Sequence, residues 1–95
     1  MGMKEAYQKK LHAELDEWSA EIEQLKAKAD KEEAESQLEY YKKIEELRTM
    51  QDQARSKLAE LEQAGNEAWE DLKAGLDSAR DTLSNAIRSA KERFK

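Results

Sequence analysis

The residues whose side chains could most readily take part in catalysis or metal binding are one histidine and a carboxylate near it. His12 is the only histidine, and Asp16 follows it four positions later, on the same side of any helix. A catalytic base needs a nucleophile or a substrate pocket beside it, and a helix surface offers neither. One imidazole with one carboxylate is also a poor ligand set for zinc. We therefore expect no metal site and no catalytic role at His12.

The other acidic residues do not form a known catalytic motif either. Glu32-Glu33 and Glu45-Glu46 are adjacent in the sequence, and we interpret them as solvated helix surface. The sequence has no Asp-x-Asp-x-Asp-Gly calcium loop, no glycine-rich phosphate loop and no serine nucleophile elbow. Cysteine is absent, which excludes disulfides and thiolate chemistry. We expect a protein that is not an enzyme and needs no cofactor.

The composition favours helices over any other element. Charged residues make up 41% of the 95 residues, proline is absent, and glycine occurs three times. Strong helix formers dominate, and their enrichment with helical periodicity is typical of coiled coils. No stretch approaches the length of a membrane-spanning helix or a signal-peptide core, so a cytoplasmic location is the default expectation. The net charge of −5 argues against nucleic acid as a partner.

Residues 3–64 show a heptad-type apolar pattern, and we predict an all-α fold class. Steps of four and three connect the first apolar positions, which are Tyr7, Leu11, Leu15, Trp18, Ile22, Leu25 and Ala29. Residues 30–37 interrupt the pattern with polar side chains but contain neither glycine nor proline. We interpret this segment as straight solvated helix; the alternatives are a turn and a docking site for a partner. The pattern then resumes, with the polar Gln51 beside it as a residue that can fix the register, through Tyr40, Tyr41, Ile44, Leu47, Met50, Ala54, Leu58 and Leu61.

An eleven-residue repeat dominates residues 58–94. The positions that recur are Leu61, Leu72, Leu83 and Phe94, then Gly65, Leu76 and Ile87, then Ala68, Ala79 and Ala90. Eleven residues in three turns return these side chains to nearly the same side of a straight helix. Gly65-Asn66 is the one candidate for a break or hairpin, because Gly often follows a helix end and Asn often caps a helix start. The apolar phase persists across it, which favours a helix over 66–94 that continues the helix over 3–64.

The apolar side chains look too few for one copy of the chain to bury. We therefore expect residues 1–95 to form a single coiled-coil domain, built as a long amphipathic helix that associates with itself. The predicted function is a structural or protein–protein interaction coiled coil, and its partner is a second copy or another helical protein. The predicted oligomer interface consists of Leu11, Leu15, Trp18, Ile22, Leu25, Ile44, Leu47, Leu58, Leu61, Leu72, Leu76, Leu83 and Ile87.

Binding to an anionic membrane surface is the alternative function. Residues 58–94 would then form a lipid-facing amphipathic helix, because an eleven-residue repeat keeps its apolar face in one direction. We interpret Trp18 and Trp69 as core residues; in the membrane alternative, Trp69 is an interfacial anchor. The cations at the end of the chain either complement the helix dipole or attract such a surface, and they are Arg88, Lys91, Arg93 and Lys95.

Four short motifs are spread over most of the chain. They are Leu15-Asp16-Glu17-Trp18 with Glu21-Ile22, Tyr41 with Ile44-Glu45-Glu46-Leu47, Leu58-Ala59-Glu60-Leu61, and Ala68-Trp69-Glu70-Asp71-Leu72-Lys73-Ala74-Gly75. Together they resemble a family of small bacterial coiled-coil proteins, some of whose members are labelled stress-response proteins. The resemblance implies a helical, bacterial protein with a stress-related role, and it carries no catalytic residues to transfer.

Overall fold

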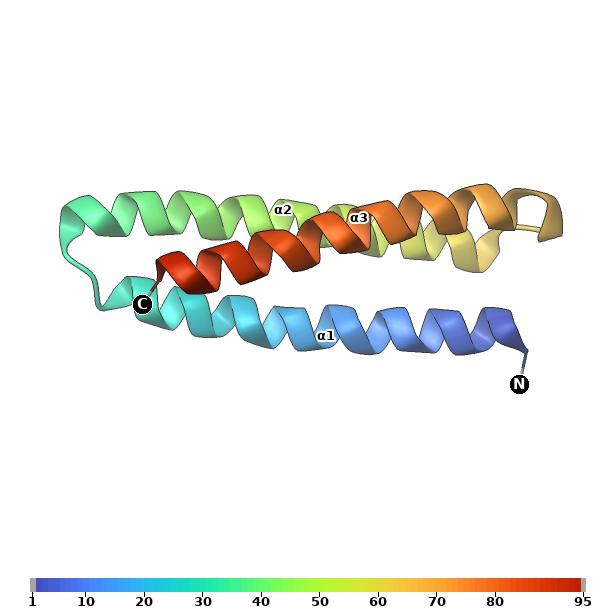
Figure 1. Ribbon diagram of the computed structural model, residues 1–95, viewed down its shortest axis with the longest axis horizontal. Coiled ribbons are helices and arrows are strands. Elements are labelled where there is room, and N and C mark those ends of the chain that lie inside the picture. Colours follow the sequence, from blue (N-terminus) through green and yellow to red (C-terminus); the bar gives the residue numbers. More distant parts are fainter. Residues whose placement is uncertain (1, 95) are drawn as a thin grey trace.

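The chain folds into three helices of similar length that pack side by side in an elongated bundle (Figure 1). The computed structural model describes residues 2–94. Helix α1 spans Met3–Asp30, α2 spans Ala34–Gln63 and α3 spans Asn66–Arg93. Helix α2 runs antiparallel to the other two, so α1 and α3 are parallel to each other. The bundle measures 50 × 20 × 18 Å along its principal axes. The all-α prediction is confirmed.

Heptad positions from all three helices form one core. The contribution of α1 is Leu11, Leu15, Trp18, Ile22, Leu25 and Ala29. That of α2 is Ile44, Leu47, Ala54, Leu58 and Leu61. That of α3, with the residue after it, is Trp69, Leu76, Leu83, Ile87, Ala90 and Phe94. Each helix therefore buries the apolar stripe that its sequence periodicity indicated.

A turn at residues 31–33 corrects the prediction of straight helix between Asp30 and Gln37. The backbone of Lys31 is still helical, with φ −93° and ψ −5°, whereas Glu33 is extended, with φ −66° and ψ 155°. The turn lets the stripes of α1 and α2 face each other within one chain. Each fully buried apolar side chain contributes roughly 1.5–3 kcal/mol, so tertiary packing outweighs the local preference for helix.

A second turn separates α2 from α3, so the helix does not continue through Gly65-Asn66. Ala64 is the C-cap of α2, and Gly65 is the N-cap of α3. Asn66 is the first helical residue of α3, one position later than an Asn cap would require. The side-chain oxygen of Asn66 instead accepts a hydrogen bond from Lys4 Nζ at the start of α1. The shared apolar phase on the two sides of Gly65 therefore did not require one continuous helix.

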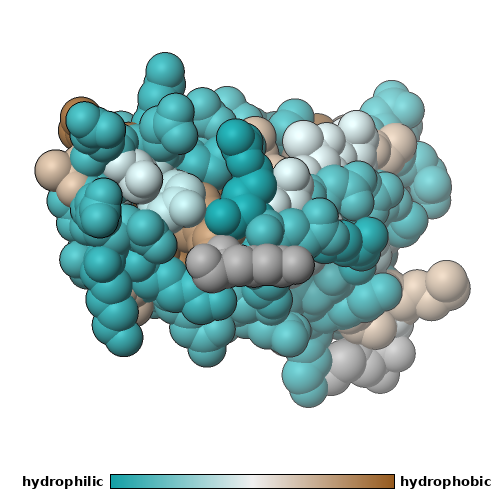
Figure 2. Space-filling view, turned by 60° about the vertical axis from the view of Figure 1, so that its left-hand side comes forward, coloured by the Kyte–Doolittle hydropathy of each residue, from teal (hydrophilic) through white to brown (hydrophobic). Residues whose placement is uncertain are grey.

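One copy of the chain does bury its own apolar residues, which corrects the expectation that they are too few. Alanines let the helices approach closely, and Ala29, Ala54 and Ala90 are all fully buried. Large exposed apolar side chains among residues 2–94 are restricted to Met3, Leu38 and Tyr41. Figure 2 accordingly shows a predominantly hydrophilic face. None of the helices in the described range is long and apolar enough to cross a membrane.

Candidate functional site

The thirteen residues predicted to form an oligomer interface lie inside the single chain. Twelve are buried, the most exposed being Trp18 at 9%, and Leu72 is half-buried. The stripe of residues 58–94 that would face a membrane likewise packs into the core, through Trp69, Leu76 and Leu83 among others. Neither set is accessible to a second copy or to lipid unless a helix moves.

A buried glutamine joins α1 to α2 in the middle of the core. Gln51 is only 8% exposed, and its Nε2 donates a hydrogen bond to the Leu15 carbonyl oxygen at 2.9 Å. It also donates to Ser19 Oγ, which accepts a second hydrogen bond from Arg55 Nη2 at 3.2 Å. A buried polar side chain can bond only in one alignment of the two helices, so it fixes their register.

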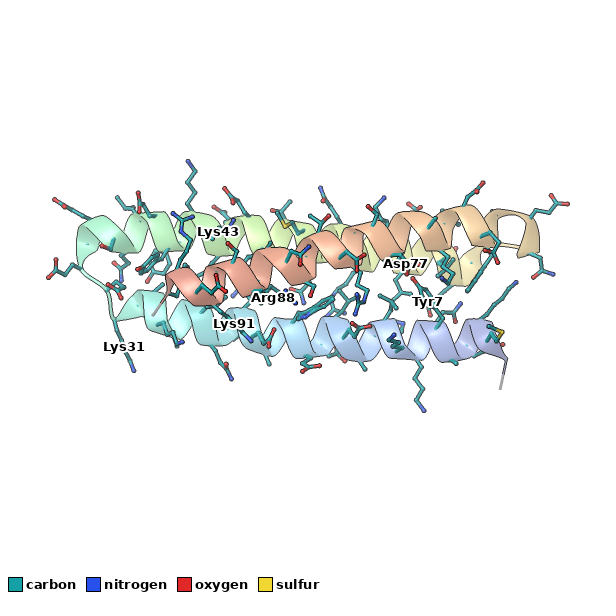
Figure 3. All side chains as sticks on the ribbon, viewed as in Figure 1. Tyr7, Lys31, Lys43, Asp77, Arg88 and Lys91 are labelled. Carbon is teal, nitrogen blue, oxygen red and sulfur yellow. The ribbon has the colours of Figure 1, made fainter. Side chains whose placement is uncertain are left out.

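A row of polar contacts joins the parallel helices α1 and α3. Tyr7, Glu14 and Glu21 are seven residues apart and thus lie on one side of α1. Their partners on α3 are Asp77, which accepts a hydrogen bond from the Tyr7 hydroxyl, Arg80, 2.6 Å from Glu14 Oε2, and Lys91, which pairs with Glu21. Figure 3 shows Tyr7 and Asp77 facing each other across the two helices. We call these contacts the α1–α3 polar row.

The α1–α3 polar row perturbs the pKa of three of its members. Burial first, and then the hydrogen bond to Asp77, raises the pKa of the Tyr7 phenol. Burial alone would raise the pKa of Asp77, but hydrogen bonds from Tyr7 and Lys73 outweigh it, and that pKa is lowered. The hydrogen bond to Glu14 raises the pKa of Arg80. All three shifts favour the protonation states that bond across the helices, namely a neutral Tyr7, an ionised Asp77 and a charged Arg80. At neutral pH the row therefore holds α1 against α3.

The sequence analysis missed this row. Tyr7 was placed in the apolar heptad pattern, and no pairing role was predicted for Glu14 or Glu21. The seven-residue spacing of the three was the available signal, because charged residues that flank a heptad seam often pair between helices. Their partners on α3 carry no matching signal, since the relative register of two helices is set by turns and core packing.

Two open cavities lie in the half of the bundle in which α1 and α3 end. One, of about 290 Å³, adjoins the stacked rings of Tyr40 and Phe94, whose centroids are 4.2 Å apart. The other, of about 200 Å³, lies between α1 and α3 beside Trp18 and the Glu21–Lys91 pair, with Arg88 at its edge. Figure 3 places Lys43, Arg88 and Lys91 in this part of the molecule. Both cavities are lined by charges of both signs, several of which pair within the bundle.

His12, for which the sequence predicted neither a catalytic nor a metal-binding role, lies on the surface between α1 and α2. His12 lies 3.2 Å from Glu62 of α2, and both side chains are substantially exposed. Within residues 2–94, no group of three or more His, Cys, Asp or Glu side chains is placed to hold a metal ion. The contacts that distinguish the described residues are those that pair the helices, and the two turns set which helices can pair.

The turn at residues 31–33, which we call the α1–α2 turn, is held by side chains from the start of α2. Gln37 Nε2 donates to the carbonyl oxygens of Ala29 and Asp30, at 3.3 Å each. The Tyr41 hydroxyl donates to Asp30 Oδ1. Glu33, the N-cap of α2, makes no side-chain capping hydrogen bond. The sequence gave no signal that Gln37 caps the end of α1, because its two hydrogen bonds can form only when the chain turns at residues 31–33.

Comparison with known protein families, with curated proteins and with solved structures gave no match. The resemblance to small bacterial coiled-coil proteins therefore stays a prediction.

Proposed function

We propose that this protein is a non-enzymatic helical module that acts by associating with a second copy of itself. The observation that carries this proposal is the kind of contact that holds the bundle. Heptad core positions connect all three helices, a buried glutamine joins α1 to α2, and charged pairs at seven-residue spacing join α1 to α3. These are the contacts by which separate helices associate in coiled coils, so they can form within one chain or between two.

Helix α1 shows why two copies would match each other. It buries six apolar residues, and together they contribute on the order of 10 kcal/mol at roughly 1.5–3 kcal/mol for each large side chain. A detached α1 would therefore be strongly unfavourable in water. A second copy offers the same core positions, the same Gln51 and the same Arg80, so α1 can pack there without losing these contacts. The surface of α2 and α3 that fits α1 is therefore present on every copy of the chain.

The test is the mass in solution after refolding at a series of concentrations, from about 10 μM to about 1 mM. Sedimentation velocity should show the 11.0 kDa monomer at the dilute end and a species of twice that mass as the concentration rises. Mass that stays at the monomer value over the whole series, with native helicity by circular dichroism, would contradict the proposal.

Anionic vesicles provide the matched test of the membrane alternative. Lipid binding through residues 58–94 requires α3 to withdraw Trp69, Leu76 and Leu83 from the core. We therefore expect the folded protein to stay in the supernatant when vesicles are sedimented at low salt. Co-sedimentation that disappears at high salt would favour the membrane function over self-association.

A further inference from the structure

We propose that the α1–α2 turn is a hinge, and that two copies exchange α1 when the turn straightens into helix. The inference rests on the self-association proposed above and specifies how it occurs. In the exchanged dimer each chain has one straight helix over residues 3–63, and its α1 segment packs on α2 and α3 of the other copy. The second turn, at residues 64–65, stays folded.

Local sequence and tertiary structure conflict at this turn. Residues 31–33 are Lys-Glu-Glu, which are strong helix formers, and the turn contains no Gly, Pro, Asn or Asp. A straight helix would also align Lys28 with Glu32 and Lys31 with Glu35 at i,i+4 spacing. The closed chain forms neither ion pair among its described residues. Local preference at this segment therefore favours helix, whereas tertiary packing holds it as a turn.

At Lys31 and Glu33, conversion of the turn to helix changes mainly one backbone angle. Lys31 already has helical angles, and the φ of Glu33, −66°, is that of an α-helix, so at these two residues the conversion is mainly a rotation of the Glu33 ψ. No residue among 2–94 has a positive φ that would resist conversion. The turn is therefore stabilised by its surroundings and not by its own conformational preference.

Gln37 is one of two side chains that favour the closed form, the other being Tyr41, whose hydroxyl donates to Asp30. Gln37 donates to the carbonyl oxygens of Ala29 and Asp30 at the end of α1, and the Ala29 oxygen also accepts the backbone N–H of Glu32. In a straight helix the backbone N–H groups of Glu33 and Ala34 would bond to the same two oxygens. The Gln37 bonds are thus needed only while the turn is closed.

The apolar stripes meet the geometric requirement of exchange. At 100° per residue, the buried residues of α1 point on average to about 20° and those of α2 to about 30°, so a straight helix carries one stripe on one side. Two such helices can lie face to face and antiparallel, with α1 of each against α2 of the other. The Gln51–Leu15 and Arg80–Glu14 contacts would then form between copies.

The second turn, at residues 64–65, converts to helix less readily than the α1–α2 turn. It contains Gly65, which costs about 1 kcal/mol relative to Ala inside a helix, and it is followed by Asn66, another weak helix former. Ala64 and Gly65 are both extended, with ψ 146° and 174°, so two consecutive residues would have to convert. Local preference therefore assigns the hinge to residues 31–33.

Proline substitutions at the two turns test the proposal directly. Glu33→Pro fits the closed form, because φ is −66° and the Glu33 N–H makes no backbone hydrogen bond among residues 2–94. Inside two straight helices it should lower the dimer association constant by about 10⁴-fold or more. Gly65→Pro is the matched control. Its φ of −77° also suits proline, a Cβ there meets nothing, and the turn at Gly65 persists in both forms, so dimerisation should not change.

Two further variants cover the case in which Glu33→Pro fails to fold. Gln37→Ala removes the caps that only the closed turn needs, and it should raise the association constant by about 10- to 100-fold. Glu33→Asn supplies a helix cap to α2 in the closed form, and it should lower the constant by a similar factor. Sedimentation after refolding at graded concentrations gives the constants. An intramolecular partner on a short linker competes at roughly millimolar effective concentration, so the wild-type dimer should form near that range.

Small-angle X-ray scattering separates exchange from simple side-by-side association. A straight helix over residues 3–63 is about 92 Å long at 1.5 Å per residue, against 50 Å for the closed bundle. A dimer no longer than the monomer, or a dimer that persists in Glu33→Pro, would overturn the exchange and leave self-association standing. Loss of the dimer in Gly65→Pro but not in Glu33→Pro would assign the hinge to the other turn and overturn the proposal. Monomers in the wild type and in Gln37→Ala at every concentration would overturn both proposals.

Discussion

Replacing Gln51 by leucine should leave the stability of the bundle nearly unchanged, although Gln51 is the one polar residue that is buried among residues 2–94. The leucine loses two hydrogen bonds, each with a net contribution of about 0.5–1.5 kcal/mol. It gains about 1.5–3 kcal/mol from the burial of an apolar side chain of similar size at a position only 8% exposed. The two terms cancel to within about 1 kcal/mol.

The acceptors that Gln51 leaves behind explain why the loss is small. The Leu15 carbonyl still accepts the backbone N–H of residue 19, as in any α-helix, and Ser19 Oγ still accepts a hydrogen bond from Arg55. The substitution by leucine therefore leaves neither of these two acceptors without a partner. Gln51→Ala differs, because it loses the same two bonds and also leaves a cavity, and it should cost about 2–4 kcal/mol.

Urea unfolding followed by circular dichroism at 222 nm measures both changes, with equal m-values as the condition for comparison. A Gln51→Leu variant as unstable as Gln51→Ala would refute the reasoning. It would mean that the two Gln51 hydrogen bonds contribute more to the free energy of unfolding than the net value of about 0.5–1.5 kcal/mol each that was used above. Ser19→Ala, alone and combined with each variant, isolates the coupling across the α1–α2 interface.

Two further predictions concern α3 and its pairing with α1. Gly75→Ala should raise the free energy of unfolding by about 1 kcal/mol, because the added Cβ meets no atom within 4 Å and Ala is the better helix former; urea unfolding checks it, and a destabilised variant would contradict it. The Tyr7 phenol should titrate above its ordinary pKa of about 10, because burial and the bond to Asp77 raise it. Its stabilising effect is therefore fully present below pH 10 and is lost as the pH rises through the raised pKa. The absorbance of ionised tyrosine at 295 nm measures this titration, and the difference between wild type and Tyr7→Phe isolates the contribution of Tyr7. A Tyr7 contribution with its midpoint at or below pH 10 would refute the shift.

The helices and their buried faces follow from the sequence because the periodic pattern is a local property. The spacing of Leu11, Leu15 and Trp18 indicates which side of α1 is buried, whatever covers that side. The same spacing does not say whether the cover comes from the same chain. Closing a three-residue turn requires little loop entropy, so packing within one chain competes well against packing between chains at low concentration.

The turns were predictable to different degrees. Gly65 and Asn66 have known preferences for helix ends, so the sequence identified them as the candidate break, although the persisting apolar phase favoured a continuous helix there. Residues 31–33 have no such preference, and the turn there exists only because α1 and α2 have facing stripes. The α1–α3 polar row is likewise a consequence of two turns and a shared core, and sequence spacing could identify only the Tyr7, Glu14 and Glu21 side of it.

An odd number of helices makes the chain enter the bundle at one end and leave it at the other (Figure 1). Tension applied through the two ends would therefore act along the 50 Å axis and slide α1 past α3. Because the two helices are parallel, sliding strains every contact between them at the same moment, whereas peeling would break them one at a time. The molecule is thus built to resist stretching more strongly than an antiparallel hairpin pulled from its open end.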